Sequence, residues 1–195
     1  YNLSAFLVHN YFTDSDINFR TQAGLTNERF DRDTKLVTAT GLVASETNVD
    51  QAANTGVVQT RVKQEDAGFF AQEEVNFQDK FIATVGIRGD KSSNNGDANA
   101  YNYYPKGSLA VNLNEFGFWN EGGTWSQFKL RAAYGEAGNF PPFGALFTSY
   151  GAFSTDGLLG ISLRGVRGDK EINSERQKEL EFGTDLGFFN GRLDF

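Results

Sequence analysis

The chain has 195 residues, a formal net charge of −7 at pH 7 and a mean hydropathy of −0.45. No run approaches the ~20 apolar residues of a membrane-spanning helix, and the acidic balance argues against nucleic acid, which needs a basic surface. There is no cysteine, so disulfides and thiolate metal sites are excluded. Polar and apolar residues alternate in successive segments, and this period of two predicts β-strands. The predicted strands cover residues 2–12, 17–29, 35–45, 68–77, 80–90, 104–114, 125–136, 174–188 and a last segment that ends at 195.

The connections between these strands differ in length in an alternating way. Short connections are expected near residues 31, 78, 115–123 and 190, and long, polar or irregular ones at 46–65, 91–103 and 137–173. A soluble sandwich has no reason to sort its loops, whereas an outer-membrane barrel has short periplasmic turns and long extracellular loops. One connection, at 13–16, is short where a long one is expected.

The two sides of the predicted strands differ in chemistry. One side carries charges and the other carries aromatic and aliphatic residues, which favours an all-β, antiparallel transmembrane β-barrel of about eight strands in this chain. Glu73 breaks the pattern because it falls on the apolar side. We predict that the apolar side faces lipid at Phe81, Val85, Leu109, Val111, Leu130, Leu180, Phe182 and Leu186. We predict that the polar side lines the lumen at Thr84, Asn112 and the candidate lumen residues Arg88, Lys129, Arg131, Glu179, Glu181 and Asp185.

Four features in order resemble a known family. They are residues 66–74 running into 79–81 (DAGFFAQEE, DKF), 86–93 (GIRGDKSS), 104–108 (YPKGS), and the pair of strands at 129–139 and 175–185. Their order resembles the barrel of SusC/RagA-type TonB-dependent transporters over residues 66–195, and the first 65 residues match in style only.

The resemblance implies a barrel of about 22 strands around a plugged lumen. It also implies import of oligosaccharides or peptides across the cell outer membrane, driven through TonB, with a SusD-like surface lipoprotein as a lid. The chain is then expected to be a partial barrel (residues 1–195) with no plug, no TonB box and no closing C-terminal strand. The start at Tyr1 and the lack of methionine agree with a piece of a longer protein. A complete eight-stranded outer-membrane barrel with a structural or adhesive role is the alternative.

The sequence gives little support to the hypothesis that this chain is an enzyme. His9 is the only histidine, and no Gly-x-Ser-x-Gly elbow accompanies it, so a structural or lumenal histidine is favoured over a hydrolase triad. Glu179 and Glu181 lie two apart on one strand face, ~7 Å from each other, a spacing that suits a glycosidase pair. We expect them instead to pair with Lys129 and Arg131 on the neighbouring strand. No enzyme activity is expected.

Two of the long connections carry side chains that could bind a ligand or a partner. Oxygens of the kind that bind Ca²⁺ occur at Asp90, Asn94, Asn95, Asp97 and Asn99, but the spacing does not fit an EF-hand. A solvated loop without a cofactor is expected there. The 137–173 segment is irregular and aromatic, and we expect it to face outward, against substrate or lid. Its candidate contact residues, which would otherwise pack the loop against itself, are Phe140, Phe143, Phe147 and Tyr150.

Overall fold

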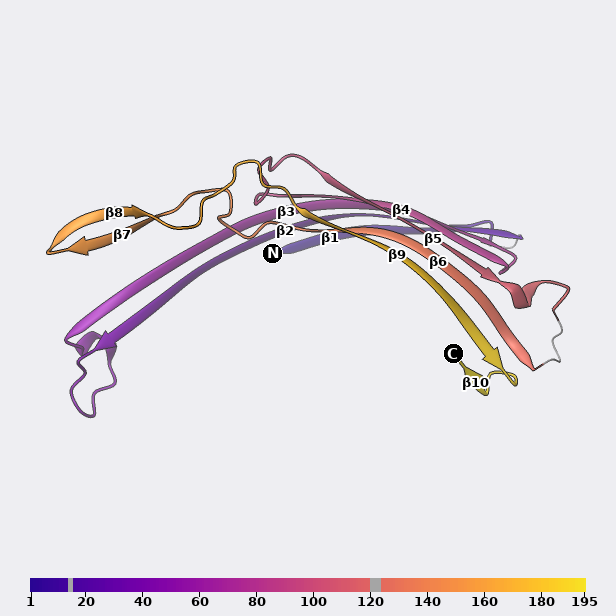
Figure 1. The fold of residues 1–195 in the computed structure, drawn as a ribbon, viewed down its shortest axis with the longest axis horizontal. Coiled ribbons are helices and arrows are strands. Elements are labelled where there is room, and N and C mark those ends of the chain that lie inside the picture. Colours follow the sequence, from indigo (N-terminus) through magenta and orange to yellow (C-terminus); the bar gives the residue numbers. More distant parts are fainter. Residues whose placement is uncertain (14–15, 120–123) are drawn as a thin grey trace.

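A computed structural model describes residues 1–13, 16–119 and 124–195. Residues 14–15 and 120–123, which fall in two of the expected connections, lie outside the described residues. The described chain forms ten strands and two 3₁₀ turns (Figure 1). Within it, no helix is long and apolar enough to cross a bilayer. The elements are β1 (Asn2–Tyr11), β2 (Ile17–Thr40), η1 (Val49–Gln51), β3 (Asn54–Phe77), β4 (Phe81–Ser92), β5 (Asn102–Asn112), η2 (Leu113–Glu115), β6 (Trp125–Asn139), β7 (Tyr150–Thr155), β8 (Leu158–Leu163), β9 (Glu175–Phe188) and β10 (Leu193–Asp194).

Eight strands form one curved, antiparallel sheet in the order β1-β2-β3-β4-β5-β6-β9-β10, and β7 and β8 form a separate hairpin (Figure 1). β1 and β10 are the edges, and among the described strands they pair only with β2 and β9. The predicted open, all-β arrangement is therefore confirmed. The sheet does not close on itself, as a complete eight-stranded barrel would require.

The register sorts the side chains into two faces. Residues opposite each other on paired strands share a face, and alternate residues of one strand point to opposite faces. Phe81 lies opposite Val111, and Val111 lies opposite Leu130, so these side chains share what we call the apolar face. All eight residues predicted for the apolar side lie on it. All eight predicted for the polar side lie on the other, here called the polar face.

The predicted turn near residue 31 is wrong, because β2 runs unbroken from Ile17 to Thr40. The segment 46–65, predicted to lack a period, contains the first half of β3. Asp33 explains the error, since its carboxylate accepts hydrogen bonds from Gln59 Nε2 at 2.8 Å and Arg61 Nε at 3.3 Å across the ladder. Charged residues that look like a turn in the sequence are cross-strand partners in the structure, where pairing overrides local propensity.

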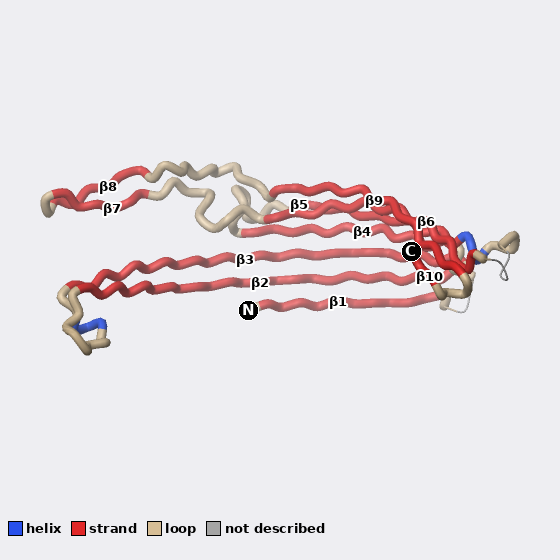
Figure 2. Tube along the Cα trace, turned by 60° about the horizontal axis from the view of Figure 1, so that its bottom comes forward, coloured by secondary structure: helices blue, strands red, loops and turns tan. Residues whose placement is uncertain are grey.

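Because β2 is one continuous strand where two were predicted, the short connection between β1 and β2 is no longer an exception to the alternation of short and long connections. Tyr11 pairs with Phe19, and Ile17 pairs with Phe77, so β1 and β2 are joined at the same end of the sheet as β3 and β4. This short-turn end also holds the β5–β6 and β9–β10 connections. Longer connections, at 41–53, 93–101 and 140–174, all lie at the opposite end. Beyond it, the outer parts of β2 and β3 pair only with each other and project in the same direction as β7–β8 (Figure 2).

Aromatic rings gather at the short-turn end of the apolar face. Tyr11 stacks on Phe19 with ring centroids 5.0 Å apart, and Trp125 lies 4.8 Å from Phe188. Phe81 packs edge-on against Phe116 of the β5–β6 connection at 5.6 Å. A band of aromatic residues at the end of an apolar strand face is typical of the membrane–water interface.

Candidate functional site: the polar face

Two rows of side chains cross the middle of the polar face. Register partners make up each row, one residue per strand from β3 to β9. The first row is Gln72, Gly86, Lys106, Gly135 and Glu179, and the second is Glu74, Thr84, Ser108, Ala133 and Glu181. Lys106 stands between two glycines, and a Cβ added at Gly86 would lie 3.0 Å from its Cε atom. The small neighbours thus leave the lysine room to lie along the sheet.

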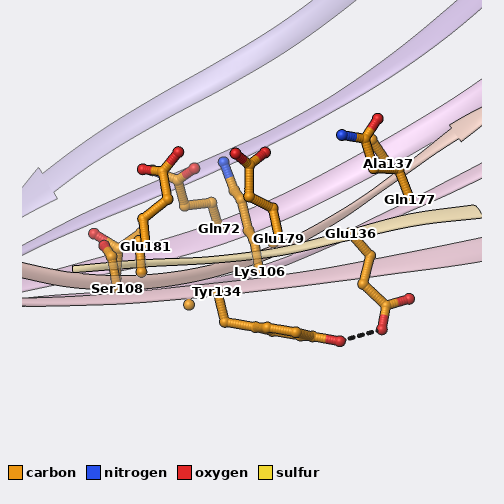
Figure 3. A pocket seen from close by; sticks show the side chains of 13 residues that line it. Gln72, Lys106, Ser108, Tyr134, Glu136, Ala137, Gln177, Glu179 and Glu181 are labelled. Carbon is orange, nitrogen blue, oxygen red and sulfur yellow. Dashed lines mark hydrogen bonds between the residues drawn. The ribbon is translucent and has the colours of Figure 1, made fainter.

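Eight of these ten residues, all but Gly86 and Glu74, line an open groove of about 450 Å³. Lys106, Glu179 and Glu181 rise from one side of the sheet together with Gln72 and Ser108 (Figure 3). Tyr134 projects to the other side, toward Glu136 (Figure 3). The groove therefore presents two carboxylates, one ammonium group, an amide and a hydroxyl to one space. Groups of this kind can bind polar solutes by hydrogen bonds and charge.

The predicted pairing of Glu179 and Glu181 with Lys129 and Arg131 is wrong. Arg131 Nη2 lies 2.8 Å from Asp185 Oδ1, and the register places Lys129 opposite that same aspartate. Opposite the two glutamates stand Gly135 and Ala133, which offer no charge. Within the described residues, neither glutamate forms an ion pair or a side-chain hydrogen bond, so both carboxylates are available to a solute.

The other candidate lumen residues share this face but not the groove. Arg88, near the outer end of β4, donates from Nε to Asp90 Oδ2 at 2.6 Å, and Arg131 and Asp185 pair farther toward the short-turn end. Lys106 was missed as a site residue. It could have been predicted from the sequence, because Lys106 lies two residues before Ser108 and therefore on the same, polar side of the strand.

The 93–101 loop holds the base of the 140–174 connection. Asn94 Nδ2 donates to the Pro141 carbonyl at 3.0 Å, and Ser174 Oγ donates to Asn95 Oδ1 at 3.0 Å. Asn95 is 1% exposed, and Ser92 is fully buried. The expectation of a solvated loop is wrong for these residues, which are buried because they fasten one loop to another. Asn94 and Asn95 thus take part in a structural joint, and within the described residues no group of three or more acidic, His or Cys side chains is placed to hold a metal.

The 140–174 connection is irregular, as predicted, except for the β7–β8 hairpin, which was not predicted. Its two legs bond to each other, for example from Arg164 N to the Ser149 carbonyl at 3.2 Å, and they carry the β7–β8 hairpin at their tip. Among the candidate contact residues, Tyr150 begins β7, Phe143 and Phe147 are exposed, and Phe140 is half-buried at the base. The hairpin adds exposed aliphatic residues that were not predicted as contact residues. They are Leu158, Leu159, Ile161, Leu163 and, just beyond the hairpin, Val166.

Glycine at position 138 makes room for Tyr104 at the base of this connection. A Cβ at Gly138 would overlap the buried Tyr104 ring and hydroxyl, whereas a Cβ at Gly135, on the same strand, meets nothing within 4 Å. We expect Gly138→Ala to lower the free energy of unfolding by about 1–3 kcal/mol through overpacking. Gly135→Ala should be neutral or stabilise by up to ~1 kcal/mol. Urea unfolding of the full-length transporter in lipid vesicles measures both, and equal effects at the two positions would contradict the packing described.

Glu73, which broke the predicted alternation, does lie on the apolar face. Its carboxylate accepts hydrogen bonds from Thr21 Oγ1 at 2.6 Å and from the Tyr11 hydroxyl at 3.1 Å. Side chains of β1 and β2 thus donate hydrogen bonds to the Glu73 carboxylate, as a charged group on an otherwise apolar surface requires. His9 stacks on Tyr11 with ring centroids 5.3 Å apart and shares this face, which favours the structural over the lumenal of the two roles expected for it.

The fold of this chain is similar to part of several solved transporter structures. The chain is similar to the RagAB peptide transporter, with a TM-score of 0.84 and 17% identity over 99% of this chain and 22% of that chain. It is similar also to the RagAB peptide importer in the "open-open" state, with a TM-score of 0.80 and 16% identity. The expected resemblance to RagA-type barrels is confirmed at the level of the fold.

Comparison with known sequences gives the family. TonB-dependent receptor P3 of Formosa agariphila is 31% identical over 130 residues, which is 64% of this chain and 13% of that protein. TonB-dependent receptor P26 of the same organism is 29% identical over 139 residues, again 13% of its length. The family model described as "TonB dependent receptor-like, beta-barrel" matches residues 2–195. Members of this family are outer-membrane transporters and not enzymes. The chain therefore belongs to the TonB-dependent receptor β-barrel family of the cell outer membrane.

Proposed function

We propose that this chain is the part of a transporter barrel that contacts an imported nutrient, an oligosaccharide, a peptide or a similar polar solute, through the groove on its polar face. One observation carries the proposal: Glu179 and Glu181 face the groove without partners in the described chain, beside Lys106. Unpaired charges in a water-filled lumen bind passing solutes without a large desolvation cost.

The two faces have different surroundings in this proposal. The polar face lines the lumen, with Arg88, Lys129, Arg131 and Asp185 around the groove, and the apolar face contacts outer-membrane lipid. The exposed apolar side chains and the aromatic band at the short-turn end support this orientation. The plug and the segment that contacts TonB are proposed to lie outside residues 1–195, because the barrel family model covers nearly all of them.

A SusD-like surface lipoprotein is proposed as the lid partner. Its contact would be the long-loop end, where the 140–174 connection carries exposed aromatic and aliphatic side chains from Phe143 to Val166. Exposed apolar patches of this kind mark interaction surfaces. The proposal is supported by the similarity of this fold to the structure of the RagAB peptide transporter.

The test of the groove is uptake by cells that produce the full-length transporter with Glu179→Gln and Glu181→Gln together. We expect uptake of the transported solute, screened with labelled peptides and labelled oligosaccharides, to fall at least about tenfold, since each lost charge-assisted hydrogen bond contributes ~1.5–3 kcal/mol. Glu179→Asp with Glu181→Asp keeps both charges and should restore most of the uptake. Uptake that stays at the wild-type level in the glutamine variant, with normal amounts of assembled barrel, would rule out this groove as the binding site.

A further inference from the structure

Three strands carry a cation at a constant distance from a phenylalanine of the aromatic band. Ten residues separate Phe19 from Arg29 on β2, Phe81 from Lys91 on β4, and Phe188 from Lys178 on β9. An even spacing puts both members of each pair on the apolar face. The cations therefore lie on the lipid-facing side as proposed above, toward the long-loop end.

The spacing corresponds to the thickness of a membrane. Ten residues of a strand span about 33 Å, and a strand tilted by ~40° rises about 25 Å over that length. This equals the height of the apolar band of outer-membrane barrels, which aromatic residues flank at both interfaces. With the phenylalanines at the interface of the short-turn end, the cations reach the opposite interface, where lipid headgroups lie.

Arg176 and Lys178 share one buried carboxylate at this level. Glu136, whose side chain is 6% exposed, lies 2.7 Å from Arg176 Nη1 and 3.6 Å from Lys178 Nζ, and it accepts a hydrogen bond from the Tyr134 hydroxyl. The two cations remain 43% and 62% exposed. One negative charge thus positions two positive ones and leaves a positive charge uncompensated at the surface.

Three further cations lie at about the same distance from the short-turn end as Arg176 and Lys178. Arg29 and Lys63 both approach Glu65, at 3.5 and 3.4 Å, while Lys91 lies over the Tyr101 ring at 5.3 Å and has no carboxylate partner in the described chain. We call the five cations Arg29, Lys63, Lys91, Arg176 and Lys178 the cationic band. Five cations face three carboxylates here, those of Glu65, Glu136 and Asp31, the last of which lies opposite Lys63, although the chain as a whole has a net charge of −7.

We propose that the cationic band binds the phosphate groups of lipid headgroups in the leaflet at the long-loop end. The band borders the exposed side chain of Leu180, two residues from Lys178, and the exposed apolar surface continues to Val85 in the middle of the span. A molecule that joins a phosphate to acyl chains therefore satisfies both surfaces at once. Free phosphate would use only the charges. Basic residues at the edge of an apolar membrane surface attract anionic headgroups, at ~1 kcal/mol per Lys or Arg.

The experiment compares lipids bound to the purified full-length transporter in detergent by native mass spectrometry, with dioleoyl phosphatidylglycerol and dioleoyl phosphatidylcholine as probes. The wild type should bind phosphatidylglycerol more tightly than phosphatidylcholine. Lys91→Gln with Lys178→Gln should weaken phosphatidylglycerol binding about thirtyfold, about fivefold for each lysine, and leave phosphatidylcholine unchanged. Lys91→Arg with Lys178→Arg should keep the preference.

The matched control moves the same change to the other face. Lys106→Gln with Lys129→Gln removes the same two charges from the polar face and should leave the lipid preference within about twofold of the wild type. Excess inorganic phosphate, at an ionic strength matched with chloride, should not displace the lipid. The proposal is overturned by a wild type without preference, by an equal loss in the control, or by displacement with inorganic phosphate, which would indicate a free-anion site.

Discussion

Replacing Val85 by arginine should lower the free energy of unfolding of the barrel by about 2–4 kcal/mol. Val85 lies on the apolar face, four residues from Phe81 and six from Lys91, close to the middle of the span between the two interfaces. A guanidinium group there would enter the hydrocarbon far from either headgroup region. Glu73 lies opposite it, but the carboxylate of Glu73 already accepts hydrogen bonds from Thr21 and Tyr11. Urea unfolding of the full-length transporter in lipid vesicles measures the loss.

The neighbouring residue is the control. Thr84→Arg places the same side chain one position along β4, on the polar face beside the groove, and should cost no more than about 1 kcal/mol. If Thr84→Arg were the more destabilising of the two, the polar face would be the one in lipid. The assignment of lumen and lipid sides proposed above would then have to be exchanged.

Removing the β7–β8 hairpin should impair nutrient uptake or lid association strongly, at least about tenfold, without loss of the assembled barrel. Residues 150–163 carry four exposed aliphatic side chains, those of Leu158, Leu159, Ile161 and Leu163, and truncated interface anchors cost 2 kcal/mol or more. Ser149 and Arg164 are already bonded across the gap, so an Asn-Gly turn can close it. Co-purification of the surface lipoprotein and uptake by intact cells are the measurements.

The structure favours this excision over a deletion of residues 140–150. That deletion would remove the Pro141 carbonyl that Asn94 binds, and so would release the base of the connection. A second variant keeps the hairpin and changes Leu158, Leu159 and Ile161 to serine, and it should show the same loss. Wild-type uptake together with wild-type lid association in both variants would refute the docking role.

Local alternation accounts for what could be predicted. Each strand from β4 onward shows its two faces within its own sequence, so Lys129 and Leu180 could be assigned to opposite faces without knowing their neighbours. The same local signal failed in β2, where Asp31-Arg32-Asp33 reads as a turn but lies within a strand. What makes these residues a strand is the partner segment about 30 residues away, which carries Lys63 and Arg61 opposite them.

Alternation along one strand does not determine the partners across strands. Lys129 and Arg131 were expected to pair with Glu179 and Glu181. The register instead places Lys129 opposite Asp185, Arg131 forms an ion pair with that same aspartate, and the two glutamates stay unpaired. Glu73 breaks the alternation in the sequence, and only the structure shows that the hydroxyl of Tyr11, 62 residues away, donates a hydrogen bond to its carboxylate. A shift of register by two residues keeps every face and changes every pair, so sequence alternation cannot distinguish such alternatives.

The sequence by itself determined that this chain is an antiparallel β protein with one charged and one apolar face, with short turns at one end and long loops at the other. That information is local, because it depends on a period of two and on turn composition. Only the tertiary structure decided which charges are paired, that the connection between β6 and β9 carries a hairpin, and that buried Asn94 and Asn95 fasten two loops. These features depend on contacts between residues far apart in the chain, and register and loop packing set those contacts together.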